Sequence, residues 1–272
     1  YAVNTLDGLR GLWVLKAALL IGAFLPVDGL MRDRGANHAS RAAGLALWSC
    51  AALAQADLRV DLCSAAFFAL LLRRLESGRT SLLFGFGLFA LWGNLHAGFP
   101  VGLALYAAYA LAARFGHGKK PKGLGAEACG AALGILLNPY GAKIYSVIAA
   151  HGADPIGRFV SEWGPVTWRM VYHRPLIGAL LVGASLAWAA RRRAPALALS
   201  AAVLALATAL SARFGIYFAS ACVGCLAVVF PRSRASWGAA VLAAATLLIG
   251  AATWRTAWGR VFADAYVARR AI

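Results

Sequence analysis

The stretch SLLFGFGLFALWGNLHAGFPVGLALYAAYALAA, residues 81–113, consists of two apolar runs joined by a short polar turn that contains Asn94 and His96. A basic side chain precedes it at Arg79, and another follows it at Arg114. Apolar runs of this kind favour helices, and basic residues at both outer ends match the excess of Lys and Arg on the cytoplasmic side of membrane proteins. The stretch therefore predicts a helical hairpin whose turn lies on the far side of a membrane.

The composition of the whole chain also indicates a membrane protein. Its 272 residues are 61% hydrophobic and 14% charged, and the mean hydropathy is +0.69, whereas soluble domains are roughly 45–50% apolar and about 25% charged. A net charge of +17 would suggest nucleic acid in a soluble protein, but here the basic residues fall in short clusters between apolar runs, without a nucleic-acid motif. We therefore expect membrane lipids, and not nucleic acid, as partners.

The apolar runs predict an all-α bundle of about 8–10 membrane helices that forms one integral membrane domain over residues 1–272. Several runs are shorter than the ~20 residues that a membrane span needs, so some helices must extend through polar flanks or enter the membrane only in part. The expected helices are Leu9–Leu25, Ala42–Ala56, Val60–Leu72, Ser81–Trp92, Val101–Ala113, Leu124–Leu137, Pro175–Ala190, Pro195–Leu210, Ile216–Phe230 and Trp237–Thr253.

Every second connection between these runs is basic, as expected if the chain crosses the membrane each time, so these connections are predicted to be cytoplasmic. The other connections hold the unusual polar residues. Because loops on one side of a membrane can converge, we expect these side chains to share an extracytoplasmic cavity. They comprise Asp57, Arg59 and Asp61, Asn94 and His96, Asn138 to Tyr140, the segment His151 to Arg174, and Arg213.

His96 is the first candidate for chemistry in these connections. An imidazole can carry a proton near neutral pH, ligate a metal or donate to a phosphate. The neighbouring Asn94, with glycines at positions 93 and 98, favours a functional interpretation, because glycine allows a ligand to approach the backbone closely. The alternative is a loop histidine bonded to a nearby carbonyl group.

Three charged residues of the outer connections have both a chemical and a structural interpretation. Glu162 could bind a divalent cation, orient a sugar hydroxyl or act as a general base, or it pairs with Arg158 or Arg169. Arg59 could bind a phosphate through its planar guanidinium or solvate a turn. Arg213 could attract a lipid-linked phosphate or extend to water at the membrane boundary.

The motif Asn138-Pro139-Tyr140-Gly141 is a turn signal, because proline presets φ and glycine closes the turn. A structural corner is enough to explain it. Its predicted place on the outer side nevertheless allows Asn138 and Tyr140 to contact the same cavity as His96.

Four motifs follow one another along the chain: LFALWGNLHAGFPVGLAL, LLNPYGAKIY, SEWGPVTW and SARFGIYFASA. Their order resembles that of bacterial multi-spanning proteins with W-x-N-x-H-G-G-F, N-P-Y-G and E-W motifs, which look like distant members of the GT-C glycosyltransferase superfamily. The resemblance covers most of the chain. It implies an active site on the outer side of the bacterial inner membrane, a polyprenyl-phosphate sugar donor and, as a candidate cofactor, a divalent cation.

The resemblance also suggests roles for particular residues, although Ala97 replaces the first glycine of the H-G-G-F pattern. The key acid of the family lies in a first outer loop that would precede Tyr1, so the chain is expected to be the C-terminal portion of a longer protein. Two functions follow: sugar transfer to an extracytoplasmic acceptor, or a non-catalytic integral subunit or scaffold of a larger membrane complex. The expected catalytic residues are His96 and Glu162, and the expected substrate-binding residues are Arg59, Asn94, Asn138, Tyr140 and Arg213.

Overall fold

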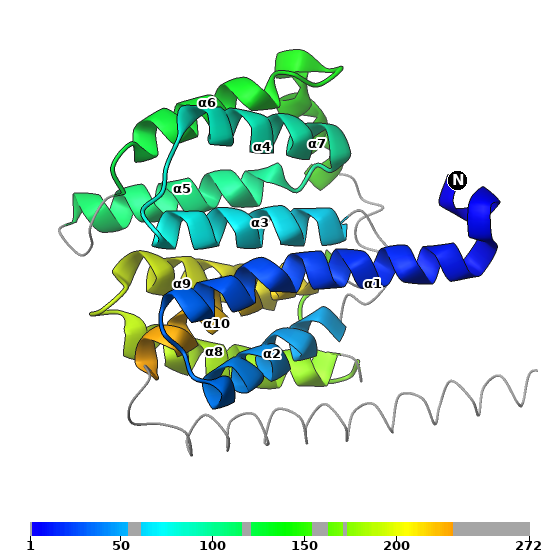
Figure 1. The fold of residues 1–272 in the computed structure, drawn as a ribbon. Coiled ribbons are helices and arrows are strands. Elements are labelled where there is room, and N and C mark those ends of the chain that lie inside the picture. The colour runs from blue at the N-terminus through cyan, green and yellow to red at the C-terminus, as the bar shows by residue number, and fades with distance from the viewer. Residues whose placement is uncertain (1, 54–60, 116–120, 154–162, 171–172, 231–272) are drawn as a thin grey trace, which may run out of the picture.

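The computed structural model describes residues 2–53, 61–115, 121–153, 163–170 and 173–230, and these ranges form ten α-helices without a strand among them (Figure 1). The prediction of an all-α fold is therefore confirmed. The helices are α1 (Ala2–Asp33), α2 (His38–Leu53), α3 (Asp61–Glu76), α4 (Leu82–Leu95), α5 (Phe99–Arg114), α6 (Leu124–Ile135), α7 (Ile144–Ala153), α8 (Arg174–Ala190), α9 (Pro195–Leu210) and α10 (Gly215–Val229), with short 3-10 turns η1 (Gly141–Lys143) and η5 (Ala212–Phe214).

Most predicted helices are present with small shifts at their ends, but the first was predicted too short. The apolar run was predicted to end at Leu25, directly before Pro26, a residue that lacks a backbone donor. Helix α1 continues through Pro26 to Asp33. Leu30 and Met31 follow the proline and are buried in the core. Their packing stabilises the helix beyond Pro26. The predicted helix Trp237–Thr253 lies outside the described residues.

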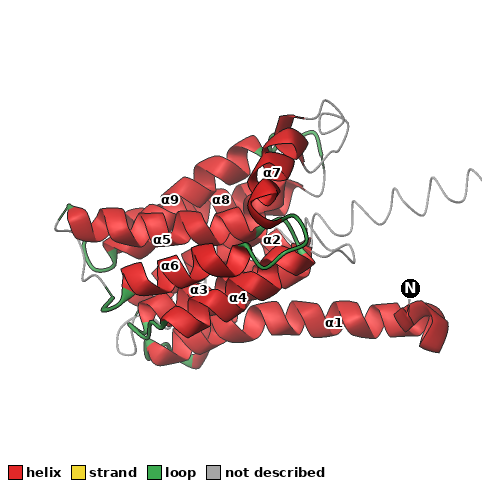
Figure 2. Ribbon diagram, turned by 90° about the horizontal axis from the view of Figure 1, so that it is seen from above, coloured by secondary structure: helices red, strands yellow, loops and turns green. Residues whose placement is uncertain are grey.

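Helix α10 is the centre of the bundle. Every residue from Gly215 to Val228 is buried, and the helix packs against α1, α2, α3, α8 and α9. A helix that is apolar on all sides belongs in a core. Helices α3 and α5 form the next layer, and α4 and α6 pack together beyond it (Figures 1 and 2).

Two of the described helical segments are long and apolar enough to cross a membrane, Val14–Asp33 and Ala212–Val229. The second is largely buried inside the bundle, as the core helix of a soluble protein also is. Six other described helices are apolar but only 10–17 residues long. Length and composition thus make these two segments candidate membrane spans, and the multi-pass topology stays a prediction.

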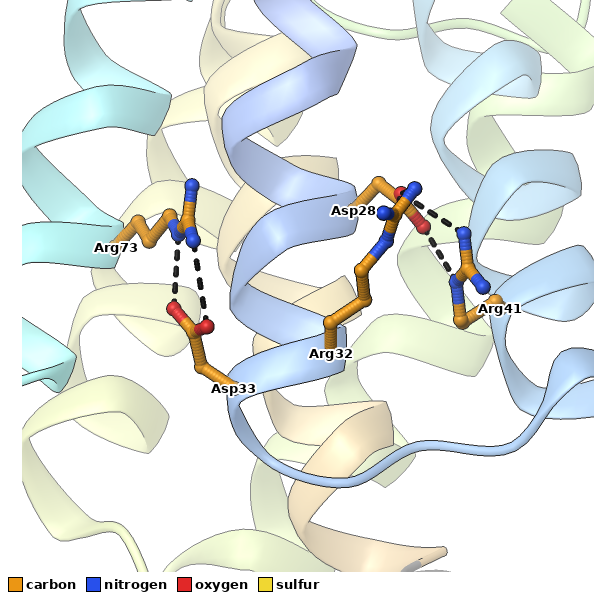
Figure 3. Close-up of polar contacts among 5 residues, drawn as sticks. All are labelled: Asp28, Arg32, Asp33, Arg41 and Arg73. Carbon is orange, nitrogen blue, oxygen red and sulfur yellow. Dashed lines mark hydrogen bonds and ion pairs between the residues drawn. The ribbon is translucent and has the colours of Figure 1, made fainter.

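Ion pairs join the ends of α1, α2 and α3 (Figure 3). Asp28 of α1 is 5% exposed and accepts two hydrogen bonds from Arg41 of α2, at 2.7 and 2.9 Å, and one from Arg32 at 2.8 Å. Asp33 accepts from Arg73 of α3 at 2.8 and 3.3 Å. Bidentate guanidinium–carboxylate pairs fix geometry as well as charge, so they hold the three helix ends in register.

Four of the five basic connections predicted to face the cytoplasm have described residues, and these lie together at one end of the bundle. The fifth, with Arg232 and Arg234, lies outside the described residues. Arg34 forms an ion pair with Glu76, and the Thr80 hydroxyl donates to the carbonyl of Lys122. Side chains from four of these connections line one open cavity at this end, including Arg34, Ser77, Lys122 and Arg192. We call this the basic end, and we call the opposite end, where α3 begins and α4 ends, the polar end.

Candidate functional site at the polar end

Three charged or titratable side chains meet at the polar end. Asp61 is the first residue of α3, His96 directly follows α4, and Arg213 belongs to η5 just before α10. The Asp61 Oδ1 atom lies 2.9 Å from Nε2 of His96 and 3.8 Å from a terminal guanidinium nitrogen of Arg213. Their side chains are 29%, 19% and 27% exposed, so all three are partly open to solvent. We call them the Asp61 cluster.

Hydrogen bonds fix the orientation and the tautomer of the His96 ring. The backbone N–H of Gly98 donates to Nδ1 at 3.1 Å, and the Ser64 hydroxyl lies 2.6 Å from the same nitrogen. Because a backbone N–H can only donate, Nδ1 is an acceptor in the neutral ring. The proton therefore lies on Nε2, from which the ring donates to Asp61.

Ser64 supports this arrangement from inside the core. It is fully buried, and its Oγ accepts a hydrogen bond from Nε1 of Trp92 at 2.7 Å. The order Asp61, His96, Ser64 is that of a hydrolytic triad, but a triad needs a serine that a substrate can reach. Ser64 is therefore a positioning residue for the ring and not a nucleophile.

Close backbone approach at Gly98 makes the ring's hydrogen bonds possible. A Cβ atom at this position would lie 2.5 Å from Oγ of Ser64 and 2.7 Å from Nδ1 of His96. No side chain fits at those distances without moving the network. Gly98 was expected to let a ligand approach the backbone closely. In the structure the group that approaches it is the imidazole of His96.

Arg213 is held over an aromatic ring from the long outer connection. Its guanidinium carbon lies 4.7 Å from the centre of the Trp163 ring, within the range of a cation–π contact. Two backbone hydrogen bonds of 3.1 Å attach residues 163–170 to the end of α9, one from Val166 to Ala209 and one from Ala212 back to this segment. The tryptophan therefore limits where the guanidinium can point.

The predicted amide ligands have mainly structural contacts. The Asn94 side chain donates to the carbonyls of Ala90 and Leu137, both at 2.8 Å, and so ties the end of α4 to the end of α6. The Asn138 side chain accepts from the Tyr140 amide at 2.7 Å and closes its own turn. Neither asparagine belongs to the Asp61 cluster.

Three other predicted site residues, Tyr140, Arg59 and Glu162, are not part of the Asp61 cluster as described. The Tyr140 ring is 59% exposed and lies outside the cluster. Arg59 and Glu162 lie outside the described residues. Of the two arginines predicted to bind phosphate, only Arg213 is among the described residues. It belongs to the Asp61 cluster.

A second histidine at the polar end has a structural role. His173 is fully buried directly before α8, and its Nδ1 accepts from the Thr167 amide at 3.2 Å. Burial lowers the pKa of this imidazole, because the charged form loses its hydration. His173 is thus kept neutral, and its ring is tied to the backbone at Thr167.

Within the described ranges, no three His, Cys, Asp or Glu side chains converge in a way that could hold a metal ion. Asp61 and His96 point at each other, and Glu162 is not described. The expected divalent cation therefore rests on the motif resemblance alone.

Comparison with known proteins does not assign the chain to a family. No protein-family model, no curated protein and no solved structure matches it.

Proposed function

We propose that the chain is a multi-pass protein of the bacterial inner membrane whose Asp61 cluster transfers a sugar from a polyprenyl phosphate to a hydroxyl group of an extracytoplasmic acceptor. One observation carries the proposal: the Asp61 carboxylate contacts both His96 and Arg213 at the end of the bundle opposite the basic end. A carboxylate beside a guanidinium supplies the general base and the phosphate-binding group that the transfer needs.

The outward-facing side chains support the membrane placement. Large apolar residues are exposed on several helices, among them Leu83 of α4 (77%), Leu181 of α8 (70%) and Leu206 of α9 (65%). A soluble monomer rarely leaves extended apolar surface in water, whereas lipid tails are a suitable environment for it. Together with the basic end, which fits the cytoplasmic side, this favours a bundle that spans the bilayer.

The chemistry follows from the placement of the three side chains. The acceptor oxygen attacks the anomeric carbon of the donor sugar, Asp61 takes the proton of that hydroxyl, and the bond from the sugar carbon to the phosphate oxygen breaks. The electron pair leaves with the polyprenyl phosphate, whose developing charge Arg213 stabilises. His96 touches neither reactant in this scheme. It positions Asp61 through its Nε2–H.

The motif resemblance suggests the class of sugar donor. The geometry of the polar end suggests which carboxylate acts as the general base. The family's key carboxylate lies in an outer loop, and Asp61 lies at the corresponding end of this bundle. Glu162, adjacent in sequence to Trp163, remains the second candidate acid. We infer that Asp61 is the base, since it contacts the arginine that would bind the leaving phosphate.

A non-catalytic membrane subunit is the alternative function, and the same contacts favour it in part. A carboxylate held by a histidine and an arginine also occurs in purely structural ion-pair networks. In that case the Asp61 cluster would anchor α3, α4 and α10 within a larger complex.

Sugar transfer from a labelled donor distinguishes the two functions. Membranes that contain the full chain are incubated with undecaprenyl phosphate carrying radiolabelled glucose or mannose, and label transferred to the acceptor fraction is counted. We expect Asp61→Asn to lower the rate at least ~100-fold, the usual scale of general-base catalysis. Arg213→Gln should reduce it similarly, through loss of charge stabilisation. His96→Gln should reduce it less and change the pH profile.

Two matched variants serve as controls. Arg174→Gln removes another polar-end arginine that lies over a tryptophan, at 5.4 Å from the Trp168 ring, and His38→Gln removes an exposed histidine at the start of α2. Both should keep the wild-type rate. If Asp61→Asn and Arg213→Gln transfer sugar like the controls, or if the wild-type chain transfers neither sugar, the enzyme proposal is wrong. Stable copurification with other subunits would then favour the alternative.

A further inference from the structure

A large open cavity lies at the basic end, at the other end of the bundle from the Asp61 cluster. It has a volume of about 2100 Å³ and opens to the outside between α5, α8 and α9. Pockets for drug-sized molecules measure roughly 300–1,000 Å³, so this one is large enough for a much bulkier ligand.

The mouth of the cavity is basic. Lys122, Arg191, Arg192 and Arg193 line it, and Glu76, which lines it too, is already paired with Arg34. The guanidinium carbon of Arg191 lies 3.6 Å from the centre of the Trp188 ring, and this cation–π contact holds one cation at the rim. Arg192 and Arg193 are exposed, and neither pairs with a carboxylate of the described chain. The rim is therefore suited to an anionic group.

The walls of the cavity are mostly apolar and extend along α9 towards the middle of the bundle. The lining residues of α9 run from Pro195 to Ala205 and include Leu199 and Ala202. At 1.5 Å per residue, this span is about 15 Å along the helix. That is about half of the ~30 Å hydrocarbon core of a bilayer. The apolar walls thus have the depth of a single leaflet.

We propose that this cavity binds an anionic phospholipid of the cytoplasmic leaflet, with its phosphate at Arg192 and Arg193 and its acyl chains along α5 and α9. Basic pockets between membrane helices on the cytoplasmic side attract anionic headgroups. A soluble anion would use only the rim, whereas a lipid also fills the walls. The inference rests on the multi-pass placement proposed above, but not on sugar transfer.

Native mass spectrometry of the full chain, purified in detergent, tests lipid retention. Phosphatidylglycerol and phosphatidylcholine are added in separate titrations, and the lipid-bound fraction is measured. Wild-type protein should prefer phosphatidylglycerol. Two arginines near an anionic group contribute enough to change affinity by roughly 30-fold, so Arg192→Gln/Arg193→Gln should lose most of the preference. Glycerol phosphate, which has no acyl chains, should not displace the lipid.

The control removes the same charge from the same end without touching the cavity. Arg79→Gln/Arg114→Gln lies outside the lining and should keep the preference. Ala202→Trp fills the apolar wall and should weaken binding of both lipids, whereas Ala132→Trp, on the outer face of α6, should not. Equal loss in the two double variants, or equal retention of both lipids by the wild type, would overturn the proposal. Asp61→Asn should bind lipid normally, so failure of one proposal leaves the other testable.

Discussion

At the scale of single residues, the polar end depends on contacts that lock one imidazole in place. The Gly98 amide determines which His96 nitrogen carries the proton, and so determines that the ring donates to Asp61. Ser64 bonds to the same nitrogen as Gly98. Trp92 fixes the serine in turn. The buried side chains of Trp92 and Ser64 therefore fix His96, and His96 positions the Asp61 carboxylate, as a preorganised site requires.

The Gly98→Ala variant tests this arrangement. Its added methyl group would lie 2.5 Å from the Ser64 hydroxyl, and overpacking of this kind typically costs about 1–3 kcal/mol. We expect a lower midpoint in thermal unfolding of the detergent-purified protein. Gly93→Ala is the control, because its nearest contact would be an ordinary 3.7 Å. Equal midpoints for the two variants would show that the close approach of Gly98 to Ser64 and His96 does not matter for stability.

At the scale of elements, glycines bring α4 and α6 into backbone contact. A Cβ atom at Gly130 would lie 2.2 Å from the Leu82 carbonyl oxygen, and one at Gly134 would lie 2.2 Å from that of Phe86. Gly130 and Gly134 form a G-x-x-x-G pattern, which allows such close contact between membrane helices. Without this contact Asn94 could not reach the end of α6, so the glycines also position the turn that follows α4.

Leucine at Gly134 should separate the two helices. We expect Gly134→Leu to destabilise the protein by at least ~2–3 kcal/mol, because the clash is with backbone and no side chain can rotate away. Urea-induced unfolding in mild detergent would measure the change. The comparison variant is Gly87→Ala, which meets nothing within 4 Å and should not lower stability, since alanine favours a helix over glycine. A stable Gly134→Leu protein would show that the contact is dispensable.

At the scale of the whole molecule, charge divides the bundle into two unlike ends. Basic connections gather at one end, where ion pairs such as Asp28 with Arg41 join the helices. The Asp61 cluster occupies the other. This division is the one that the proposed membrane placement predicts, because Lys- and Arg-rich connections stay on the cytoplasmic side.

Cysteine labelling in intact cells tests the predicted orientation. A membrane-impermeant maleimide should label Ala97→Cys, an exposed polar-end position, without lysis. Arg192→Cys, at the basic end, should react only after permeabilisation. The wild-type chain, with five cysteines of its own, supplies the background. Labelling of both positions in intact cells, or of neither, would contradict a protein that exposes its two ends to different compartments.

Sequence patterns predicted much of the site but not its support. Asp61, His96 and Arg213 were all assigned to the outer side, and the structure brings them together. Ser64 and Trp92 were missed because both lie in apolar runs. For Ser64 the spacing was the available signal, since it is three residues after Asp61 on α3, and such residues share a helix face. For Trp92 the signal was its place four residues before His96 in the same short motif.

Asn94 is the opposite case. Its spacing from His96 suggested that both side chains face one ligand, but they diverge where α4 ends. The asparagine turns to the end of α6, and the histidine turns to α3. A local pattern cannot tell which neighbouring helix each side chain will meet.

The sequence by itself determined the all-α class, most helix positions and the separation of basic from polar connections, because these depend on local hydropathy and charge. Only the tertiary structure decided that Asp61 is the shared partner of His96 and Arg213, that α1 passes through Pro26, and that the basic end contains a cavity. Each of these depends on packing between residues far apart in the chain. Such packing is set by which helices lie side by side, and no single run of residues encodes that choice.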